Sequence, residues 1–367
     1  SDISGAFDTV LTPYLLAKLY RAGVGEIFLN FLGSYLAPRY GRVLVQGASS
    51  EKNPIANSVY QGTVLGPPLW NTFFADVDDA ARSSGGAEKM FADDLNVFQL
   101  FDRLAPPAEC TAVLEKCKQN VHKWGETNRV SFDASKEHII LLHPSESFGE
   151  TFKLLGCPVD PDLRMHSAVD QVLNKIRPKA TAILRTRGYY SVGDLILQFK
   201  THVWGLIESH LGAYFHAAPS LLDKIDGVQR HFLRELGLTS EQAFLEFNFA
   251  PPSLRRNIAV LGLLHKRVIG KCHPSFEQLL PWWGDRFSEA RGHGHTKQLY
   301  GHWVEVTSHQ ALYDRSIFAM VDIYNNLPQH AVDAPSVSIF QSYLNHIACT
   351  KCQHGDAAWA ASFCRRV

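Results

Sequence analysis

Several features that define other protein classes are missing from this sequence of 367 residues. Its seven cysteines are odd in number, irregularly spaced and not preceded by a secretory hydrophobic segment, which argues against a disulfide framework and predicts reduced thiols inside a cell. No apolar run approaches the roughly 20 residues of a membrane-spanning helix. The sequence also lacks a glycine-rich phosphate loop, and its 17 histidines accompany no nucleophile motif. A P-loop nucleotide site and a Ser-His-Asp hydrolase therefore find no support.

An excess of charge of one sign is also lacking, because 36 Lys and Arg balance 36 Asp and Glu. The charges are nevertheless distributed unevenly. Residues 1–100 hold ten acidic against seven basic residues, 164–234 hold ten basic against five acidic, and 250–271 hold five basic and no acidic residues. This distribution is typical of an enzyme that collects metal ions in one part and binds phosphates in another, and also of ordinary solvated helix faces.

The hydrophobic pattern predicts a chain of the α+β class. The first part should contain helices at 12–23, 26–36, 68–81 and 108–127, and strands at 42–46, 54–59, 130–132, 138–143 and 152–157. Pro158 and Pro161 interrupt the pattern and predict a domain boundary near 158–165. Beyond it we expect helices at 166–187, 191–215, 219–236 and 252–270, and a helix-rich remainder.

Two short acidic segments are the candidates for chemistry. Asp2 opens the segment Asp-Ile-Ser-Gly-Ala-Phe-Asp, and Asp93 and Asp94 lie in Phe-Ala-Asp-Asp. The apolar flanks of the second segment, within 89–101, predict a hairpin with the acids at its tip. Nucleotide transfer by two divalent ions requires such carboxylates from neighbouring strands. An Asp-Asp pair considered by itself is more often a simple turn.

Five segments, in this order, resemble motifs A to E of the reverse transcriptases of LINE-type (non-LTR) retrotransposons. They are 2–8 for motif A, 58–67 for motif B, 91–94 for motif C, 131–136 for motif D and 153–157 for motif E. Tyr60 stands where motif B of the family usually has proline, and Phe91 is the LINE-type residue of motif C. A looser likeness continues through 228–230, 252–256 and 263–267.

The resemblance implies a polymerase palm, in which an antiparallel sheet carries helices on one face, followed by an α-helical thumb and a helix-rich tail. We expect the palm at 1–160, the thumb at 161–237 and the tail at 238–367. Because the sequence starts within the motif that resembles A, the fingers and the LINE endonuclease are expected to be missing. A chain without fingers is expected to be weak or inactive alone.

The activity implied by the resemblance is RNA-directed DNA polymerisation, which transfers deoxynucleotides (dNTPs) to a primer 3′-hydroxyl on an RNA template with two Mg²⁺ or Mn²⁺ ions. Asp2, Asp93 and Asp94 are implied as catalytic metal ligands, and the carbonyl group of Ile3 would complete one coordination shell. Lys136 is implied to protonate or neutralise the leaving pyrophosphate; a surface lysine at the start of a strand explains it nearly as well.

The resemblance also implies residues that bind the substrates. Phe7 would be the steric gate against a 2′-hydroxyl, with a core aromatic as the alternative. Gln61 and Gly62 would contact the templating pair. Leu155 and Gly156 would press on the last sugar of the primer.

Basic residues after the palm are candidates to hold the backbone of a template–primer duplex, although each is also explained as a plain surface charge. They are Lys175, Arg177, Lys179, Arg185, Arg187 and Lys200. Near the C-terminus, Cys349, Cys352, His354 and Cys364 have the residue types of zinc ligands. Their spacing fits no zinc module, so zinc is not expected there.

Two rival interpretations stay open. The first is a non-catalytic nucleic-acid-binding remnant of a retroelement, which Tyr60 and the missing fingers favour and the intact acids disfavour. The second is a maturase-like splicing factor of the same superfamily, which the form of motif C and the LINE-like tail disfavour. The resemblance further implies a ribonucleoprotein of cytoplasm and nucleus, without a membrane partner, and leaves the oligomeric state open.

Overall fold

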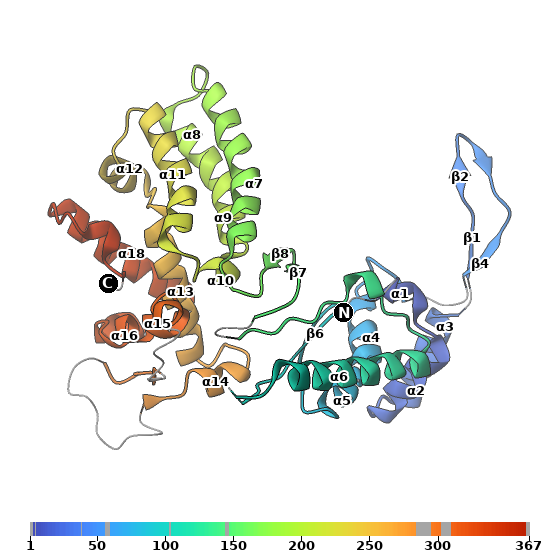
Figure 1. Ribbon diagram of the computed structural model, residues 1–367. Helices are drawn as coiled ribbons and strands as arrows, with labels where there is room; N and C mark the ends of the chain where they lie inside the picture. The colour runs from blue at the N-terminus through green and yellow to red at the C-terminus, as the bar shows by residue number, and fades with distance from the viewer. Residues whose placement is uncertain are drawn as a thin grey trace. The chain divides into compact units, whose positions relative to one another are not determined.

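The computed structural model describes residues 3, 5–37, 39–55, 59–102, 104–143, 147–283, 295–301 and 310–364. The chain divides into two compact units, Ser1–Glu150 and Thr151–Val367. Both contain helices and antiparallel strands, so the predicted α+β class is confirmed (Figure 1). Among the described residues, no helix combines the length and the apolar character that crossing a membrane requires.

Unit 1 begins with three helices, continues through a long hairpin arm and ends with further helices around a second hairpin. Its helices are α1 (Ala6–Thr9), α2 (Thr12–Arg21), α3 (Glu26–Tyr35), α4 (Gly66–Phe74), α5 (Val77–Arg82), α6 (Pro107–Asn128) and a 3₁₀-helix (Ala134–Lys136). Its strands are β1 (Arg39–Gly41), β2 (Leu44–Val45), β3 (Ala48–Ser49), β4 (Asn53–Ile55), β5 (Ala87–Phe91) and β6 (Asp94–Phe98). The helices predicted at 12–23, 26–36 and 108–127 are thereby confirmed.

The core of unit 1 lies around α4. Trp70, Phe73 and Phe74 of this helix are buried, and they pack with Leu15 of α2 and Leu32 of α3. The single helix predicted at 68–81 is wrong, because α4 ends at Phe74 and α5 begins at Val77 after a turn. Val77 and Ala81 of α5 continue the helical spacing of the buried residues Phe73 and Phe74 across the break, which is why the hydrophobic pattern predicts one helix.

The strands of the described part pair two by two. β1 pairs with β4, β2 with β3, and β5 with β6, all antiparallel. The first two pairs follow one another along an arm, residues 39–55, which projects from unit 1 (Figure 1). The strand predicted at 42–46 is confirmed in part by β2. The strand predicted at 54–59 overlaps β4, and its residues 56–58 lie outside the described residues.

Two strands predicted in unit 1 do not form. Range 130–132 contributes only an isolated bridge between Ile3 and Phe132, and range 138–143 only a bridge between Leu141 and Phe148. The chain turns immediately after Phe132, because the carboxylate of Asp133 accepts a hydrogen bond from the backbone N–H of Ser135 at 3.0 Å and initiates the 3₁₀-helix.

Unit 2 opens with a small hairpin of β7 (Phe152–Leu154) and β8 (Cys157–Val159). We predicted one strand at 152–157, which is wrong. Leu155 and Gly156 both have positive φ, 48° and 80°, and reverse the chain in a two-residue turn. Gly156 favours the turn, because glycine adopts a positive φ without steric cost.

The remainder of unit 2 is helical. Its α-helices are α7 (His166–Arg185), α8 (Val192–Phe199), α9 (Gly205–Glu208), α10 (Leu211–Tyr214), α11 (Pro219–Glu235), α12 (Ser240–Phe247), α13 (Pro252–Val268), α14 (Ser275–Leu279), α15 (Gln310–Tyr313), α16 (Met320–Asn325), α17 (Gln329–Val332) and α18 (Val337–Gln353). A π-helix (Lys200–Trp204) joins α8 to α9, and 3₁₀-helices span Ile317–Ala319 and Trp359–Ala361. The predictions at 166–187, 219–236 and 252–270 are confirmed, whereas 191–215 is helical with interruptions.

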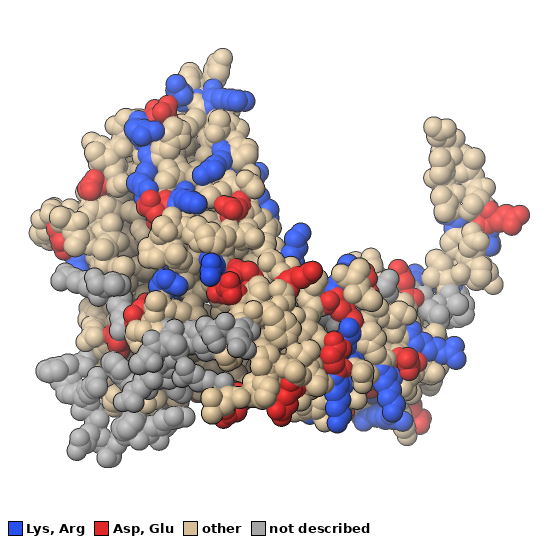
Figure 2. Space-filling view, viewed as in Figure 1, with Lys and Arg blue, Asp and Glu red and all other residues tan. Residues whose placement is uncertain are grey.

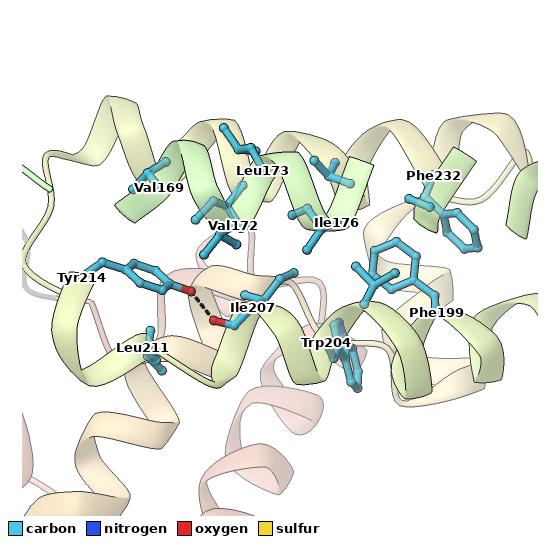
Figure 3. Packing of buried hydrophobic residues seen from close by; sticks show 14 of the residues in the cluster. Val169, Val172, Leu173, Ile176, Phe199, Trp204, Ile207, Leu211, Tyr214 and Phe232 are labelled. Atoms are coloured by element: carbon cyan, nitrogen blue, oxygen red, sulfur yellow. Dashed lines mark hydrogen bonds between the residues drawn. The ribbon is translucent and has the colours of Figure 1, made fainter. Parts of the chain in front are cut away.

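Two hydrophobic clusters stabilise unit 2. The first is built on the stripe of α7 that contains Val169, Val172, Leu173 and Ile176, at the spacing of one helix face. Figure 3 shows this stripe packed against Phe199, Trp204, Ile207, Leu211, Tyr214 and Phe232. The phenol group of Tyr214 donates a hydrogen bond to the backbone oxygen of Ile207 in this core (Figure 3). The second cluster joins α13, α16 and α18.

Candidate functional site in the first unit

The acids Asp93 and Asp94 lie at the tip of the β5–β6 hairpin, as predicted. Phe91 pairs with Asp94, which leaves Ala92 and Asp93 as the two turn residues. Ala92 has a φ of 55°, in the left-handed region that tight hairpin turns use. Both acids are half-buried, and Leu95, which follows them on β6, is buried in the core of unit 1. The hairpin therefore presents two neighbouring carboxylates from a well-anchored strand.

Trp70 of α4 anchors the hairpin tip. Its indole Nε1–H donates a hydrogen bond of 2.8 Å to the backbone oxygen of Ala92, and only 1% of the residue is exposed. The same indole stacks on the ring of Phe7, with 5.6 Å between centroids and 21° between planes. The structure thus brings Phe7, the predicted steric gate, together with the turn that carries Asp93. We did not identify Trp70 from the sequence, because a tryptophan in a hydrophobic helix stripe predicts only a core position.

The segment that resembles motif B lies against Phe7. The backbone oxygen of Phe7 accepts a hydrogen bond from the N–H of Val59 at 2.9 Å. A Cβ atom at Gly66 would lie 2.6 Å from the oxygen of Tyr60 and 3.5 Å from Cε1 of Phe7, so that only glycine fits there without a shift. Gln61 and Gly62 are exposed in the turn between these two contacts, and Gly62 has a φ of 78°.

Tyr60, at the position where the family has proline, attaches this turn to α3 and to the arm. Its hydroxyl group donates a hydrogen bond of 2.8 Å to the oxygen of Tyr35, and the two rings are 4.9 Å apart. The guanidinium group of Arg39 lies 3.0 Å from the centroid of the Tyr60 ring. The departure from the family pattern therefore has a structural role in this chain.

One predicted metal ligand, Asp2, lies outside the described residues. Its neighbour Ile3 is buried and forms the antiparallel bridge with Phe132, which places Ile3 of the segment resembling motif A beside the segment resembling motif D. Within the described part of the chain, no three His, Cys, Asp or Glu residues form a group that could hold a metal ion. The ligand set of Asp2, Asp93 and Asp94 stays a prediction.

Lys136 ends the 3₁₀-helix and is exposed. Its ammonium group lies 3.7 Å from Oδ2 of Asp133, whose pKa is lowered mainly by the hydrogen bonds that it accepts from Ser135. The side chain of the next residue, Glu137, is almost fully buried and lies 2.6 Å from His122 and 3.1 Å from Lys118, both on α6. Burial raises the pKa of Glu137, but these two partners outweigh it and the pKa is lowered. Glu137 thus fixes the chain beside Lys136, a role that the sequence did not reveal.

The remaining predicted site residues belong to unit 2. Leu155 and Gly156 form the β7–β8 turn, with the side chain of Leu155 exposed. The oxygen of Gly156 accepts a hydrogen bond of 3.1 Å from Nε2 of Gln171 on α7, so the turn is attached to that helix. The turn that carries the exposed side chain of Leu155 is therefore fixed to α7.

Most of the predicted phosphate-binding cations are accessible. Those on α7 and in the turn after it are exposed: Lys175, Arg177, Lys179, Arg185 and Arg187. Lys200 differs, because its ammonium group donates a hydrogen bond of 2.5 Å to the oxygen of Phe247. Burial, and then the nearby charge of Arg255, lower the pKa of Lys200. Lys200 therefore serves the packing of unit 2.

The cysteines near the C-terminus lie on and after α18. Cys352 is buried and Cys349 half-buried, whereas His354 and Cys364 are exposed. The imidazole Nδ1 of His354 is 2.7 Å from the oxygen of Thr350, one turn back on the same helix. These contacts orient His354 toward its own backbone.

Comparison with known proteins agrees with the arrangement in unit 1. Residues 1–159 match the sequence model of a family described as reverse transcriptase (RNA-dependent DNA polymerase). The chain is 27% identical over 256 residues to the RNA-directed DNA polymerase from mobile element jockey of Drosophila melanogaster, and 26% identical over 261 residues to the protein of that name from Drosophila funebris. In each comparison 64% of this chain is covered, and the chain spans 28% of the length of the relative.

A third relative is the retrovirus-related Pol polyprotein from type-1 retrotransposable element R2 of Popillia japonica. It is 36% identical over 70 residues, which make up 19% of this chain and 12% of the relative. All three relatives are named after mobile or retrotransposable elements, in agreement with the resemblance of the motifs. Through its residues 1–159, this chain is thus similar to reverse transcriptases, and its relatives support the interpretation of a LINE-type enzyme.

Proposed function

We propose that this chain is part of an RNA-directed DNA polymerase, which transfers dNTPs to the 3′-hydroxyl of a primer paired with an RNA template. The observation that carries the proposal is the hairpin tip with Asp93 and Asp94, held by Trp70 against Phe7. Polymerisation of this kind needs accurate placement of charge and little covalent chemistry from the protein. A rigid pair of carboxylates beside an aromatic gate meets that need.

Two divalent ions, Mg²⁺ or Mn²⁺, are part of the proposal. Asp93 and Asp94 supply carboxylate oxygens, which hard divalent cations prefer, and Asp2 would be the third ligand. When bound, the ions activate the primer 3′-oxygen and neutralise the charge of the triphosphate. The donor chemistry of the hairpin tip therefore fits such ions.

The other residues orient the substrates and move a proton. The ring of Phe7, fixed by its stacking on Trp70, excludes a ribose 2′-hydroxyl. Gln61 and Gly62 contact the templating pair from their exposed turn. Leu155 and Gly156 press on the sugar of the primer terminus. Lys136 donates a proton to, or neutralises, the departing pyrophosphate.

In this proposal residues 1–160 form the palm, 161–237 the thumb and 238–367 the tail. The β5–β6 hairpin with α4 and α6 beside it supports the palm. The cluster on α7, α8 and α11, distinct from the one on α13, α16 and α18, supports a thumb followed by a separate tail core. The exposed cations of α7 would hold the backbone of the template–primer duplex.

The alternative of a non-catalytic nucleic-acid-binding remnant has less support. Tyr60 was one of the two features that favoured it, beside the expected absence of the fingers. The contacts of Tyr60 with Tyr35 and Arg39 give this residue a place in an ordered site. The acids that polymerisation needs are present in the sequence.

Primer extension on poly(rA)–oligo(dT) with Mg²⁺ or Mn²⁺ tests the proposal. We expect Asp93→Ala to reduce extension by at least about a hundredfold, because one of the charged groups that stabilise the transition state is lost. The matched control is Asp79→Ala, which removes an exposed acid from the first turn of α5. Absence of extension from both the chain and its Asp93→Ala variant, with equal duplex binding, would favour the remnant until the upstream residues are restored and the assay is repeated.

A further inference from the structure

The turn between α7 and α8 exposes two large aromatic side chains. Arg185 ends α7, Val192 begins α8, and Tyr189 and Tyr190 lie between them with 88% and 51% of their surface exposed. Single exposed apolar residues are normal on protein surfaces. Two adjacent tyrosines at the end of a helical hairpin form a larger surface that water solvates poorly, and their rings are suited to stacking.

The turn is ordered by hydrogen bonds on both sides of the tyrosines. The backbone N–H of Thr186 donates to the oxygen of Ile183 at 3.0 Å, and the N–H of Tyr189 donates to the oxygen of Thr186 at 2.9 Å. Ser191 and Asp194 then form a capping box at the start of α8. The tyrosine rings are therefore presented by a rigid support, which lowers the entropy lost on binding a ligand.

The surroundings of the turn are basic. Residues 171–190 contain no acid and five cations, all exposed: Lys175, Arg177, Lys179, Arg185 and Arg187. Of the acids near the tip, Asp194 is engaged in the capping box, and Glu235 lies 3.8 Å from Arg187. The α7–α8 turn lies at the top of Figure 1, and Figure 2 shows Lys and Arg side chains on both sides of the uncharged tip. The charge is complementary to a polyanion.

Rigid aromatic rings flanked by cations match one chemical partner in particular. Phosphates attract the cations, and nucleobases stack on the rings only where they are unpaired and accessible. We propose that the α7–α8 turn binds single-stranded nucleic acid, with Tyr189 and Tyr190 stacking on bases and with Arg185 and Arg187 contacting the flanking phosphates. Arg185 is thereby assigned to the single strand, and the contact is additional to the duplex contacts proposed for Lys175, Arg177 and Lys179 of α7. It rests on the proposed function only for the identity of the strand as template.

Fluorescence anisotropy with two labelled probes tests this contact without any nucleotide or catalysis. One probe is an oligo(rU) of about 12 nucleotides, within the range of single-strand site sizes, and the other is a blunt RNA–DNA duplex of the same length. The double variant Tyr189→Ala/Tyr190→Ala removes the rings, and Tyr189→Phe/Tyr190→Phe keeps them. Tyr20→Ala, which removes a 64% exposed tyrosine from α2, is the control.

We expect the double alanine variant to bind oligo(rU) at least about tenfold more weakly, with the salt dependence of binding unchanged, and the phenylalanine variant to bind normally. Arg185→Gln/Arg187→Gln should reduce the slope of log K against log[salt] by about 1.4, because each phosphate contact on a single strand contributes about 0.7. Tyr20→Ala should bind as the wild type does. A loss of affinity at an unchanged salt slope indicates stacking, whereas a reduced salt slope indicates phosphate contacts.

The proposal is overturned if the alanine variant loses duplex affinity as strongly as single-strand affinity, because the turn would then contact the duplex. It is also overturned if the tyrosine substitutions change neither affinity, or if the wild-type chain does not bind oligo(rU). Since the assay contains no reaction, its outcome is independent of primer extension by the wild type and by Asp93→Ala. Failure of the polymerase proposal and failure of this contact are therefore distinguishable.

Discussion

The indole N–H of Trp70 donates a hydrogen bond to the backbone oxygen of Ala92, the residue immediately before Asp93. Because the same indole stacks on Phe7, one buried side chain contacts both the acidic turn and the residue predicted to be the steric gate. Trp70 of α4 thus contacts two segments that are far apart in the sequence, one through its N–H group and one through its ring. Trp70 is in this sense a positioning residue for the proposed reaction.

Replacing Trp70 by phenylalanine tests this role. Trp70→Phe keeps a ring for Phe7 and removes the N–H donor, so we expect a loss of stability of about 1 kcal/mol, the usual net contribution of one hydrogen bond. In primer extension, the Mg²⁺ concentration for half-maximal rate should rise several-fold, because the acidic turn is less well fixed. Thermal unfolding and Mg²⁺ titration measure the two effects. An unchanged Mg²⁺ requirement alongside reduced stability would make Trp70 a core residue only.

The sugar selectivity of a Phe7 variant distinguishes the two interpretations of Phe7, a steric gate or a core aromatic. We expect Phe7→Ala to reduce the preference for dGTP over GTP by at least about tenfold, since space for the 2′-hydroxyl is opened. Competition between the two nucleotides in primer extension on poly(rC)–oligo(dG) provides the measurement. Phe98→Ala, which truncates an exposed aromatic side chain on β6, should leave the preference unchanged. If Phe7→Ala lowers the melting temperature without changing selectivity, the core interpretation holds.

The buried ion pair between Asp226 of α11 and Arg256 of α13 is expected to affect the free energy of unfolding when one partner is removed. Two hydrogen bonds join the guanidinium and carboxylate groups, one of them 2.8 Å long. Arg256→Met leaves a buried carboxylate without its partner, and we expect a loss of about 3–5 kcal/mol. The double variant Asp226→Leu/Arg256→Met should recover much of that loss. Urea unfolding of both variants measures the difference, and equal stabilities would contradict the pairing argument.

Two buried histidines give the second cluster of unit 2 a dependence on pH. His265 is within hydrogen-bonding distance of Tyr324 and the oxygen of Ala334, and His295 lies 2.9 Å from the oxygen of Tyr324. Burial lowers the pKa of both imidazole groups below the ordinary value of 6.5. As the pH falls below about 6.5, the unfolded chain binds protons first, and the free energy of unfolding decreases.

Chemical unfolding measured between about pH 8 and about pH 5 should show full stability at the upper end and a progressive loss below about 6.5. His265→Gln keeps hydrogen-bonding groups without a titrating ring, and we expect it to make this pH dependence shallower. Stability that stays constant down to pH 5 in the wild type would show that these histidines do not charge on unfolding.

Local patterns in the sequence were sufficient for the elements that carry most of the site. The apolar flanks of Asp93 and Asp94 predicted the hairpin with the acids at its tip, and the single hydrophobic face of α7 predicted that helix almost to its ends. Both features depend on neighbours within a few residues. The residue types around Phe7, Gln61 and Gly62 were recognisable through the family resemblance.

Contacts between segments that are distant in the sequence could not be predicted from local patterns. Glu137 pairs with His122 and Lys118 on α6. Trp70 donates a hydrogen bond to the carbonyl group of Ala92, 22 residues later in the chain. Neither relation leaves a periodic signal. The strand predicted at 138–143 failed for the same reason, because an apolar run becomes a strand only where a partner is available to complete its hydrogen bonds. Glu137 would have been expected on the surface from its residue type.

The arm of residues 39–55 has a consequence for handling the purified chain. Within the described residues, β1 and β4 have no strand neighbour other than each other, and Val43, Leu44 and Val45 are exposed along the arm. Open strand edges with apolar side chains recruit further strands from other molecules. Concentrated solutions should therefore become turbid on storage, and light scattering should show that Val43→Lys/Val45→Lys keeps them clear. Colloidal behaviour, and with it the yield of any preparation, would then depend on a few residues remote from the acidic turn.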